Sequence, residues 1–199
     1  MPRPSPLFRS TARAAALLLV TAASSWAAAP TKAAPAAVPA PAAPACPTPG
    51  APTAAFSFPL PLSGDRVSLN SLKSKDKPIV LAFWAYSCGP CILELPALQK
   101  LSSEWGDRVS VVLVHVGGCG DDAPAGCGEQ KMRDALDKWQ ITLPAALDES
   151  KKISGEKYCV KELPRLLVLD GAGTVKGSFG ALGAGFEATV RAEVARLLR

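Results

Sequence analysis

The sequence is poor in histidine, in paired cysteine motifs, in clusters of basic residues and in long apolar runs. It has a single histidine, His115, and one Cys-x-x-Cys motif, with no second Cys or His pair at zinc-finger spacing. It lacks a cluster of basic residues of the kind that binds nucleic acid. The apolar run near its start, from Ala14 to Ala23, is well short of the ~20 residues that span a bilayer. These features argue against a zinc finger, a nucleic-acid-binding protein and an uncleaved membrane anchor.

Acidic residues are missing from the first 64 positions, because Asp65 is the first in the chain. Arg3, Arg9 and Arg13 precede the apolar run, and Ala27-Ala28-Ala29 follows it, which is the pattern of a cleaved export signal over residues 1–29. These three arginines belong to the 22 basic residues, so 19 remain against 17 acidic ones after cleavage. The mature chain would therefore be nearly neutral, and the basic isoelectric point of the full chain does not indicate an acidic partner such as a nucleic acid. The predicted location is periplasmic or otherwise extracytoplasmic, with a membrane tether if the signal is not cleaved.

Alanine and proline dominate residues 30–55, a composition that cannot build a core and predicts an extended, semi-rigid linker. Residues 56–199 that follow are long enough for one domain with a single core.

The rest of the chain is organised around one stretch, in which a strand, a tight turn and a helix meet. Ile79 to Trp84 is a continuous apolar run, typical of a strand buried on both faces. After Cys88-Gly89-Pro90-Cys91, apolar residues recur with helical spacing, at Ile92, Leu95, Leu98 and Leu101. The Cys-x-x-Cys motif therefore lies at the start of a helix.

A cysteine pair at this place is suited to redox chemistry. Near a helix start, Cys88 faces unpaired backbone N–H groups and the positive end of the helix dipole, which stabilise a thiolate. Cys91 lies one turn further on the same face, so that the two sulfurs can form a disulfide. Pro90 presets a helical φ in the first turn. The motif predicts a redox dithiol.

The sequence resembles the thioredoxin superfamily, and within it the TlpA/ResA/DsbE-like extracytoplasmic thiol–disulfide oxidoreductases. The residues that carry the resemblance are Phe83-Trp84-Ala85, the motif itself, Glu94-Leu95-Pro96 and, much later, the segment from Tyr158 to Pro164. It covers roughly residues 56 to 199. The resemblance implies an α/β thioredoxin fold with three α/β/α layers, a mixed central sheet and an extra N-terminal β-hairpin.

The order of apolar runs and turn residues fits this fold. Strands are expected at 56–60, 67–69, 79–84, 109–116, 143–147, 166–169 and 174–179, with a capped helical turn at Asn70. Helices are expected after Cys88, at 129–139 and 149–157, and at the C-terminus, where Phe186, Val190, Val194 and Leu197 share a face.

Two further residues are predicted to act at the site. The resemblance implies that Pro164 is a cis proline that lies against the dithiol and exposes backbone for an extended substrate; Arg165 stands where relatives often have threonine. The resemblance also implies that Glu94 lies near the dithiol and influences proton transfer, although a solvated helix position is the alternative. Pro96 is expected to kink the helix.

His115 is interpreted as a core or strand-end histidine rather than as a metal ligand or an acid–base group. Trp84 is expected to pack beneath the site, and Tyr86 and Ser87 to shape the surface that meets the partner.

Three other cysteines lie in the predicted domain. Cys119 and Cys127 bracket a flexible loop, and a structural disulfide between them is the favoured interpretation, with a second redox-active pair as the alternative. Cys159 replaces a glycine common in relatives; it is either free or paired with Cys46 on the linker, and the sequence leaves this open.

Together these features predict an exported, monomeric enzyme without cofactor or metal that reduces protein disulfides. Cys88 attacks a substrate disulfide, Cys91 resolves the mixed disulfide, and a membrane thiol donor restores the dithiol. Cytochrome c maturation is a candidate setting. The alternatives are a disulfide-forming oxidase, favoured if Cys88 is very acidic, and a non-enzymatic copper- or zinc-handling module that uses the two thiolates and a histidine.

Overall fold

The structure is a computed structural model that describes residues 46–120 and 124–199. Its centre is a five-stranded mixed sheet with the order β5-β4-β3-β6-β7. The central strand β3 (Ile79–Trp84) runs parallel to β4 (Ser110–Val116) and antiparallel to β6 (Arg165–Leu169). The edges are β5 (Ala145–Asp148) and β7 (Val175–Phe179). All six residues of β3 are buried, as the continuous apolar run predicts.

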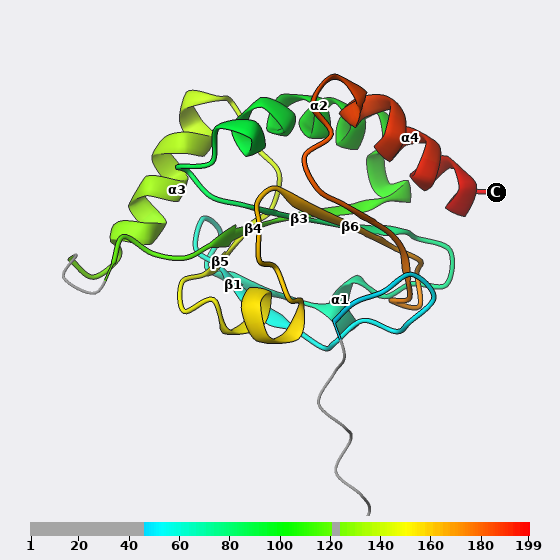
Figure 1. Cartoon of the computed structure of the whole chain (residues 1–199), viewed down its shortest axis with the longest axis horizontal. Coiled ribbons are helices and arrows are strands. Elements are labelled where there is room, and N and C mark those ends of the chain that lie inside the picture. Colours follow the sequence, from blue (N-terminus) through cyan, green and yellow to red (C-terminus); the bar gives the residue numbers. More distant parts are fainter. Residues whose placement is uncertain (1–45, 121–123) are drawn as a thin grey trace, which may run out of the picture. The chain divides into compact units, whose positions relative to one another are not determined.

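Helices cover one face of this sheet, and a hairpin with two short helical segments covers the other (Figure 1). The first face carries α2 (Gly89–Trp105), α3 (Cys127–Lys138) and α4 (Phe186–Leu197). The second face carries β1 (Ser57–Leu60), β2 (Asp65–Ser68), α1 (Leu69–Leu72) and the helical turn η2 (Lys152–Lys157). Two further turns are η1 (Gly106–Arg108) and η3 (Gly183–Gly185).

Side chains of β3 alternate between two apolar cores, because successive residues of a strand point to opposite faces. Val80, Ala82 and Trp84 pack against the helices, whereas Ile79, Leu81 and Phe83 pack against the hairpin side. This arrangement confirms the predicted thioredoxin fold and its extra N-terminal hairpin.

Several element boundaries differ from the predicted ones. The cap of α1 is Ser68 rather than Asn70, with the Ser68 hydroxyl accepting from the Ser71 N–H and the Ser71 hydroxyl accepting from the Ser68 N–H. The helix predicted over 149–157 is only the six-residue turn η2, which follows Lys151 in a left-handed conformation at φ 57°. Pro96 lies inside α2, which continues to Trp105.

Residues 46–55, the last part of the predicted linker, lie against the domain. The N–H groups of Gly50 and Thr53 donate to carbonyls of Val175 and Gly173, and the Tyr158 hydroxyl donates to the Ala54 carbonyl at 2.8 Å. Cys46 forms a disulfide with Cys159, 113 positions later. This resolves the choice that the sequence left open for Cys159. The predicted signal and the rest of the linker lie outside the described residues.

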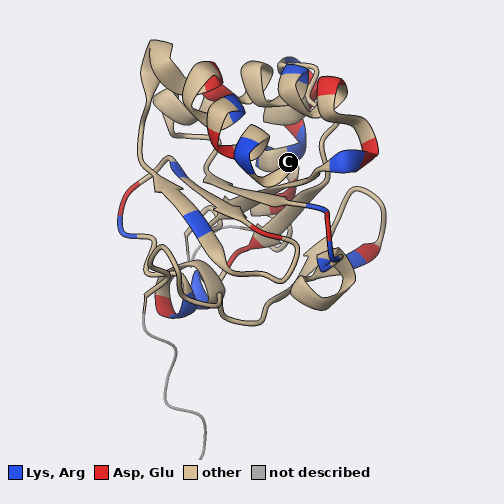
Figure 2. Cartoon of the chain, turned by 90° about the vertical axis from the view of Figure 1, so that its right-hand side faces the viewer, with Lys and Arg blue, Asp and Glu red and all other residues tan. Residues whose placement is uncertain are grey.

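Charged side chains of both signs are interspersed over the helices (Figure 2). On α4, for example, Arg191 pairs with both Glu104 and Glu187. Within residues 46–120 and 124–199, the helices are too short or too polar to cross a membrane.

Candidate redox site

The turn before the motif is held by the backbone and by a histidine from the neighbouring strand. The Cys88 N–H donates to the Ala85 carbonyl at 3.0 Å, and the Tyr86 N–H donates to Nε2 of His115 at 3.1 Å. Trp84 and His115 are partners in the β3–β4 register, so the end of β3 places Tyr86 next to this imidazole. The path of the chain into Cys88 is therefore fixed from two sides.

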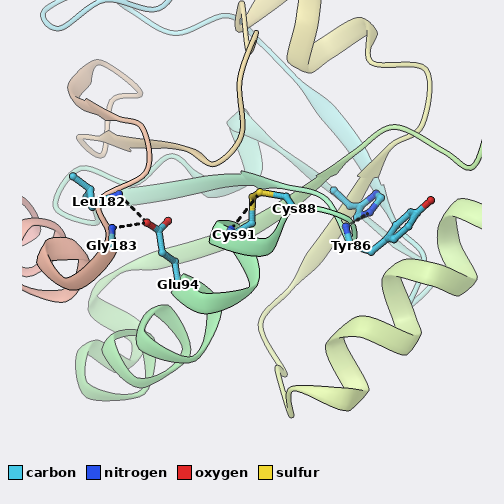
Figure 3. Close-up of a disulfide and its surroundings, with 7 residues drawn as sticks. Tyr86, Cys88, Cys91, Glu94, Leu182 and Gly183 are labelled. Atoms are coloured by element: carbon cyan, nitrogen blue, oxygen red, sulfur yellow. Dashed lines mark hydrogen bonds between the residues drawn. A yellow bond between two sulfur atoms is a disulfide. The ribbon is translucent and has the colours of Figure 1, made fainter.

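Cys88 is the N-cap of α2 and is bonded to Cys91, one turn inside the helix (Figure 3). The Cys91 N–H donates to Sγ of Cys88 at 3.3 Å. Cys88 is partly exposed, whereas Cys91 is only 1% exposed. An N-cap sulfur that accepts a backbone N–H at the positive end of a 17-residue helix has its thiolate form stabilised when the disulfide is open.

Glu94 lies one turn after Cys91 and is 7% exposed. Its Oε1 accepts N–H bonds from Leu182 at 2.9 Å and Gly183 at 3.3 Å, in the loop that leads to α4 (Figure 3). Burial raises the pKa of this carboxyl, and the two backbone bonds offset part of that effect. Glu94, which was expected to lie near the dithiol, is thus a buried carboxyl group that accepts two backbone N–H bonds.

Three of the four residues predicted to act at the site, all except Cys88, line one small cavity of about 20 Å³. Cys91, Glu94 and Trp84 line it from the motif side, and Pro164 lines it from the loop before β6. The Leu163–Pro164 peptide bond is cis. The structure therefore brings together Cys91, Glu94 and Pro164, which lie up to 73 positions apart in the chain.

His115 has a supporting position that the sequence did not predict. It is fully buried, stacks on the Tyr86 ring at 5.5 Å between centroids and contacts Trp84 edge-on at 5.1 Å. Burial lowers its pKa to about 4, against a smaller opposing contribution from the Gly117 backbone, so the ring is neutral and its Nε2 is free to accept. Among the described residues its Nδ1 has no hydrogen-bond partner. This contact follows from the β3–β4 register, which the sequence does not show.

Cys119 and Cys127 are bonded to each other, as predicted, and close the loop between β4 and α3. The Tyr86 hydroxyl lies 4.0 Å from Sγ of Cys119, so this disulfide borders the same turn as the motif. In the part of the chain that the structure describes, no group of three or more His, Cys, Asp or Glu side chains is placed to hold a metal ion.

The sequence profile of the AhpC/TSA family matches residues 49–178, which is more than half of the chain. The chain belongs to the AhpC/TSA family.

Several curated relatives of this AhpC/TSA chain are thioredoxin-like proteins or thiol-disulfide oxidoreductases. It is 34% identical over 115 residues to the thioredoxin-like protein YneN of Bacillus subtilis, a match that covers 58% of this chain and 62% of the relative. It is 26% identical over 135 residues to the thiol-disulfide oxidoreductase YkuV of the same organism, covering 65% and 87%. The match to ResA of Bacillus cereus is 27% over 115 residues, covering 57% and 60%. The chain thus spans about three fifths of YneN and ResA.

Solved structures show the same fold at low identity. A putative thiol:disulfide interchange protein DsbE from Chlorobium tepidum superposes with a TM-score of 0.65 at 19% identity, covering 77% of this chain and 99% of that one. StoA from Bacillus subtilis superposes with a TM-score of 0.57 at 22% identity, covering 73% and 99%.

Proposed function

We propose that the protein is a thiol–disulfide oxidoreductase in which Cys88 is the attacking thiol and Cys91 the resolving thiol. The observation that carries this proposal is the contrast within the pair. Sγ of Cys88 is partly exposed at the N-cap of α2 and accepts the Cys91 N–H, whereas Cys91 is almost fully buried. A substrate sulfur can therefore approach Cys88 but not Cys91. The thioredoxin fold and the relatives named as thiol-disulfide oxidoreductases support the same activity.

The reaction proceeds in two exchange steps. The Cys88 thiolate attacks one sulfur of a substrate disulfide, which breaks, and the first substrate thiolate leaves and takes a proton. The Cys91 thiolate then attacks Sγ of Cys88, which breaks the mixed disulfide and releases the second substrate thiolate. Two electrons pass from the dithiol to the substrate. The Cys88–Cys91 disulfide, the form present in the structure, is the product on the protein.

In this proposal Glu94 accepts the proton of Cys91. Both groups line the same small cavity, and the raised pKa of Glu94 brings the carboxyl closer to the pKa of a thiol. A general base works best when its pKa lies near the operating pH.

We further propose that the protein is exported and that it reduces its substrates in the cell. All six cysteines of the chain are bonded in pairs, which fits an oxidising compartment, and the arginine-led apolar run at the N-terminus fits an export signal. The substrate is a protein disulfide, with cytochrome c maturation as the candidate setting, and a membrane thiol donor restores the dithiol. Gly89-Pro90 between the cysteines, which resembles reducing relatives, supports this direction.

Single cysteine variants test the two roles. Cys88→Ser should lower disulfide exchange to the level of a protein-free control, because the attacking thiolate is gone. Cys91→Ser should retain the attack and accumulate a mixed disulfide with the substrate, which non-reducing electrophoresis and mass spectrometry detect. If Cys88→Ser trapped an adduct and Cys91→Ser did not, the assignment of the two roles would be reversed.

A further inference from the structure

Two grooves flank the Cys88–Cys91 disulfide on opposite sides. In Figure 3, Tyr86 lies on one side of the disulfide, and Glu94 with Leu182 and Gly183 lies on the other. A groove of about 330 Å³ adjoins Tyr86, and a groove of about 460 Å³ lies between α2 and the loop before α4. A polypeptide that crosses the disulfide meets both.

The groove beside Tyr86, here called the lysine groove, carries positive charge. Among the residues that the structure describes, its charged lining residues are Lys151 and Lys161, with no acidic one; Leu163, next to the cis proline, lines it as well. Neither lysine belongs to any ion pair formed by the described residues. Two unpaired ammonium groups in a concave surface attract an anionic group more strongly than they would on a flat one.

Lys151 is held in this position by its backbone and by a glycine. Its N–H donates to the Asp148 carbonyl at 3.1 Å and its carbonyl accepts from Gly155 at 2.8 Å. Its aliphatic chain lies over Gly117, where a Cβ would come within 2.7 Å of Cε. Asp148 and Glu149 line a neighbouring cavity that shares Gly118 and Lys151 with the lysine groove, and the Glu149 side chain lies against Gly118. Neither carboxylate is within ion-pair distance of Lys151.

The second groove is mainly apolar at its mouth. Leu93 is 76% exposed beside it, and Pro90, Ala97, Ala181 and Phe186 contribute to its lining. Two acidic residues line it as well: Glu94, which is buried and accepts the Leu182 and Gly183 N–H groups, and Glu187, which forms ion pairs with Lys100 and Arg191. A large exposed leucine beside an apolar groove is typical of a surface that a protein partner covers.

We propose that the protein prefers substrates with an acidic side chain beside the reactive cysteine, which Lys151 and Lys161 recognise. This inference rests on the proposed thiol–disulfide exchange and adds the charge of the substrate. The occupant is an extended polypeptide rather than a small anionic disulfide, because a small molecule would leave the groove beside Leu93 uncovered. Basic substrates are disfavoured by the same two charges.

The test compares three peptides of equal length, each with one disulfide, whose cysteine is flanked by aspartate, serine or lysine. Second-order rate constants are measured with the reduced protein, and the rate with neutral 2-hydroxyethyl disulfide serves as the reference. The wild-type protein should react fastest with the aspartate peptide. Each exposed charge pair should contribute about two- to fivefold, because such pairs are worth only a few tenths to one kcal/mol, and added salt should reduce the preference.

Variants assign the preference to the groove. Lys151→Gln with Lys161→Gln should bring the ratio of aspartate to lysine peptide rates close to one, and Lys151→Glu with Lys161→Glu should invert it. Lys73→Gln with Lys75→Gln is the matched control, because these lysines precede β3 at the opposite end of the sheet and the net charge changes equally.

An equal ratio in the wild-type and Lys151→Gln/Lys161→Gln proteins would overturn this inference, as would the same fall in the control. Absence of reaction with 2-hydroxyethyl disulfide in the wild-type protein would instead overturn the proposed function.

Discussion

Glu94 is buried one turn after Cys91 and lines the same cavity, where its charge can influence the thiols. The side chain could have been a solvated helix residue, but it is 7% exposed and its Oε1 accepts two backbone N–H bonds. A negative charge in this position disfavours a second one on Cys91, which shares its cavity.

We expect Glu94→Gln to lower the pKa of the Cys91 thiol, because a nearby like charge is removed. The amide oxygen of Gln can still accept the N–H bonds from Leu182 and Gly183, so the loop stays in place. Alkylation rates of the reduced thiols across pH measure the shift. Glu104→Gln, on the last turns of the same helix, is the control. Superimposable profiles for Glu94→Gln and the wild type would remove Glu94 from the mechanism.

His115 should make stability depend on pH. Its pKa is about 4 in the folded protein against 6.5 in an unfolded chain, so the unfolded state binds more protons between these values. His115 therefore stabilises the folded protein above pH 6.5, and this contribution is lost as the pH falls towards 4. At about 1.36 kcal/mol per pKa unit, the contribution to the free energy of unfolding is up to about 3 kcal/mol.

The measurement is the free energy of unfolding at pH 7, 5.5 and 4, for the wild type and for His115→Gln, which does not titrate. The wild type should lose more stability than the variant over this range. Glu94 titrates in both proteins, so its contribution cancels in the difference. Parallel profiles would show that the imidazole is not held neutral by the fold.

The local strand–turn–helix pattern predicted Cys88 and Cys91 as site residues, whereas Glu94 and Pro164 followed from the family resemblance. The bond between His115 Nε2 and the Tyr86 N–H was not predictable in the same way. It depends on the pairing of Trp84 with His115 across two strands, and that register is a property of the sheet rather than of either segment.

At the level of elements, buried strands were predicted well and helix starts less well. β3 is a continuous apolar run and β4 an apolar run broken near its end by His115; both need two covered faces, which is a strong signal in the sequence. α3 begins at Cys127, two residues before the predicted start, because Gly126 in a left-handed conformation and the disulfide set its first turn without a side-chain cap. The turn η2 has no side-chain cap either, which left its start undefined.

The Cys119–Cys127 disulfide is expected to stay intact during turnover and to stabilise the connection between β4 and α3. Its loop entropy is worth up to about 2 to 3 kcal/mol, so Cys119→Ser with Cys127→Ser should lower the free energy of unfolding by that amount. Non-reducing peptide mapping after repeated turnover shows whether the bond persists. Recovery of Cys119 and Cys127 as free thiols together with the Cys88–Cys91 pair would point to a second redox centre.

At the scale of the molecule, the Cys46–Cys159 disulfide joins the start of the described chain to the loop before Pro164. Composition could assign residues 46–55 only to the linker, because their hydrogen bonds are made by backbone groups, to β7, to the turn before it and to the side chains of Lys157 and Tyr158. A crosslink between residues this distant restricts the unfolded chain far more than one across a short loop.

Cys46→Ala with Cys159→Gly should therefore lower the free energy of unfolding more than loss of the Cys119–Cys127 bond. A loop of about 100 residues corresponds to about 4 to 5 kcal/mol. Glycine is chosen at 159 because Cys159 has φ 51°, which glycine adopts without strain. Denaturant titration of both double variants in oxidising buffer gives the comparison. A smaller loss from the Cys46–Cys159 variant would mean that this crosslink does not govern the stability of the domain.

If the Cys88–Cys91 couple reduces disulfides of exported proteins, its reduction potential must be low enough for the dithiol to give up electrons readily. Equilibration of the protein in defined ratios of reduced and oxidised dithiothreitol, followed by alkylation and mass spectrometry of the motif peptide, gives the value. We predict a potential near the thioredoxin range of about −270 mV, where the dithiol gives its electrons readily. A potential near −120 mV would show that the couple is a strong oxidant and would contradict the account.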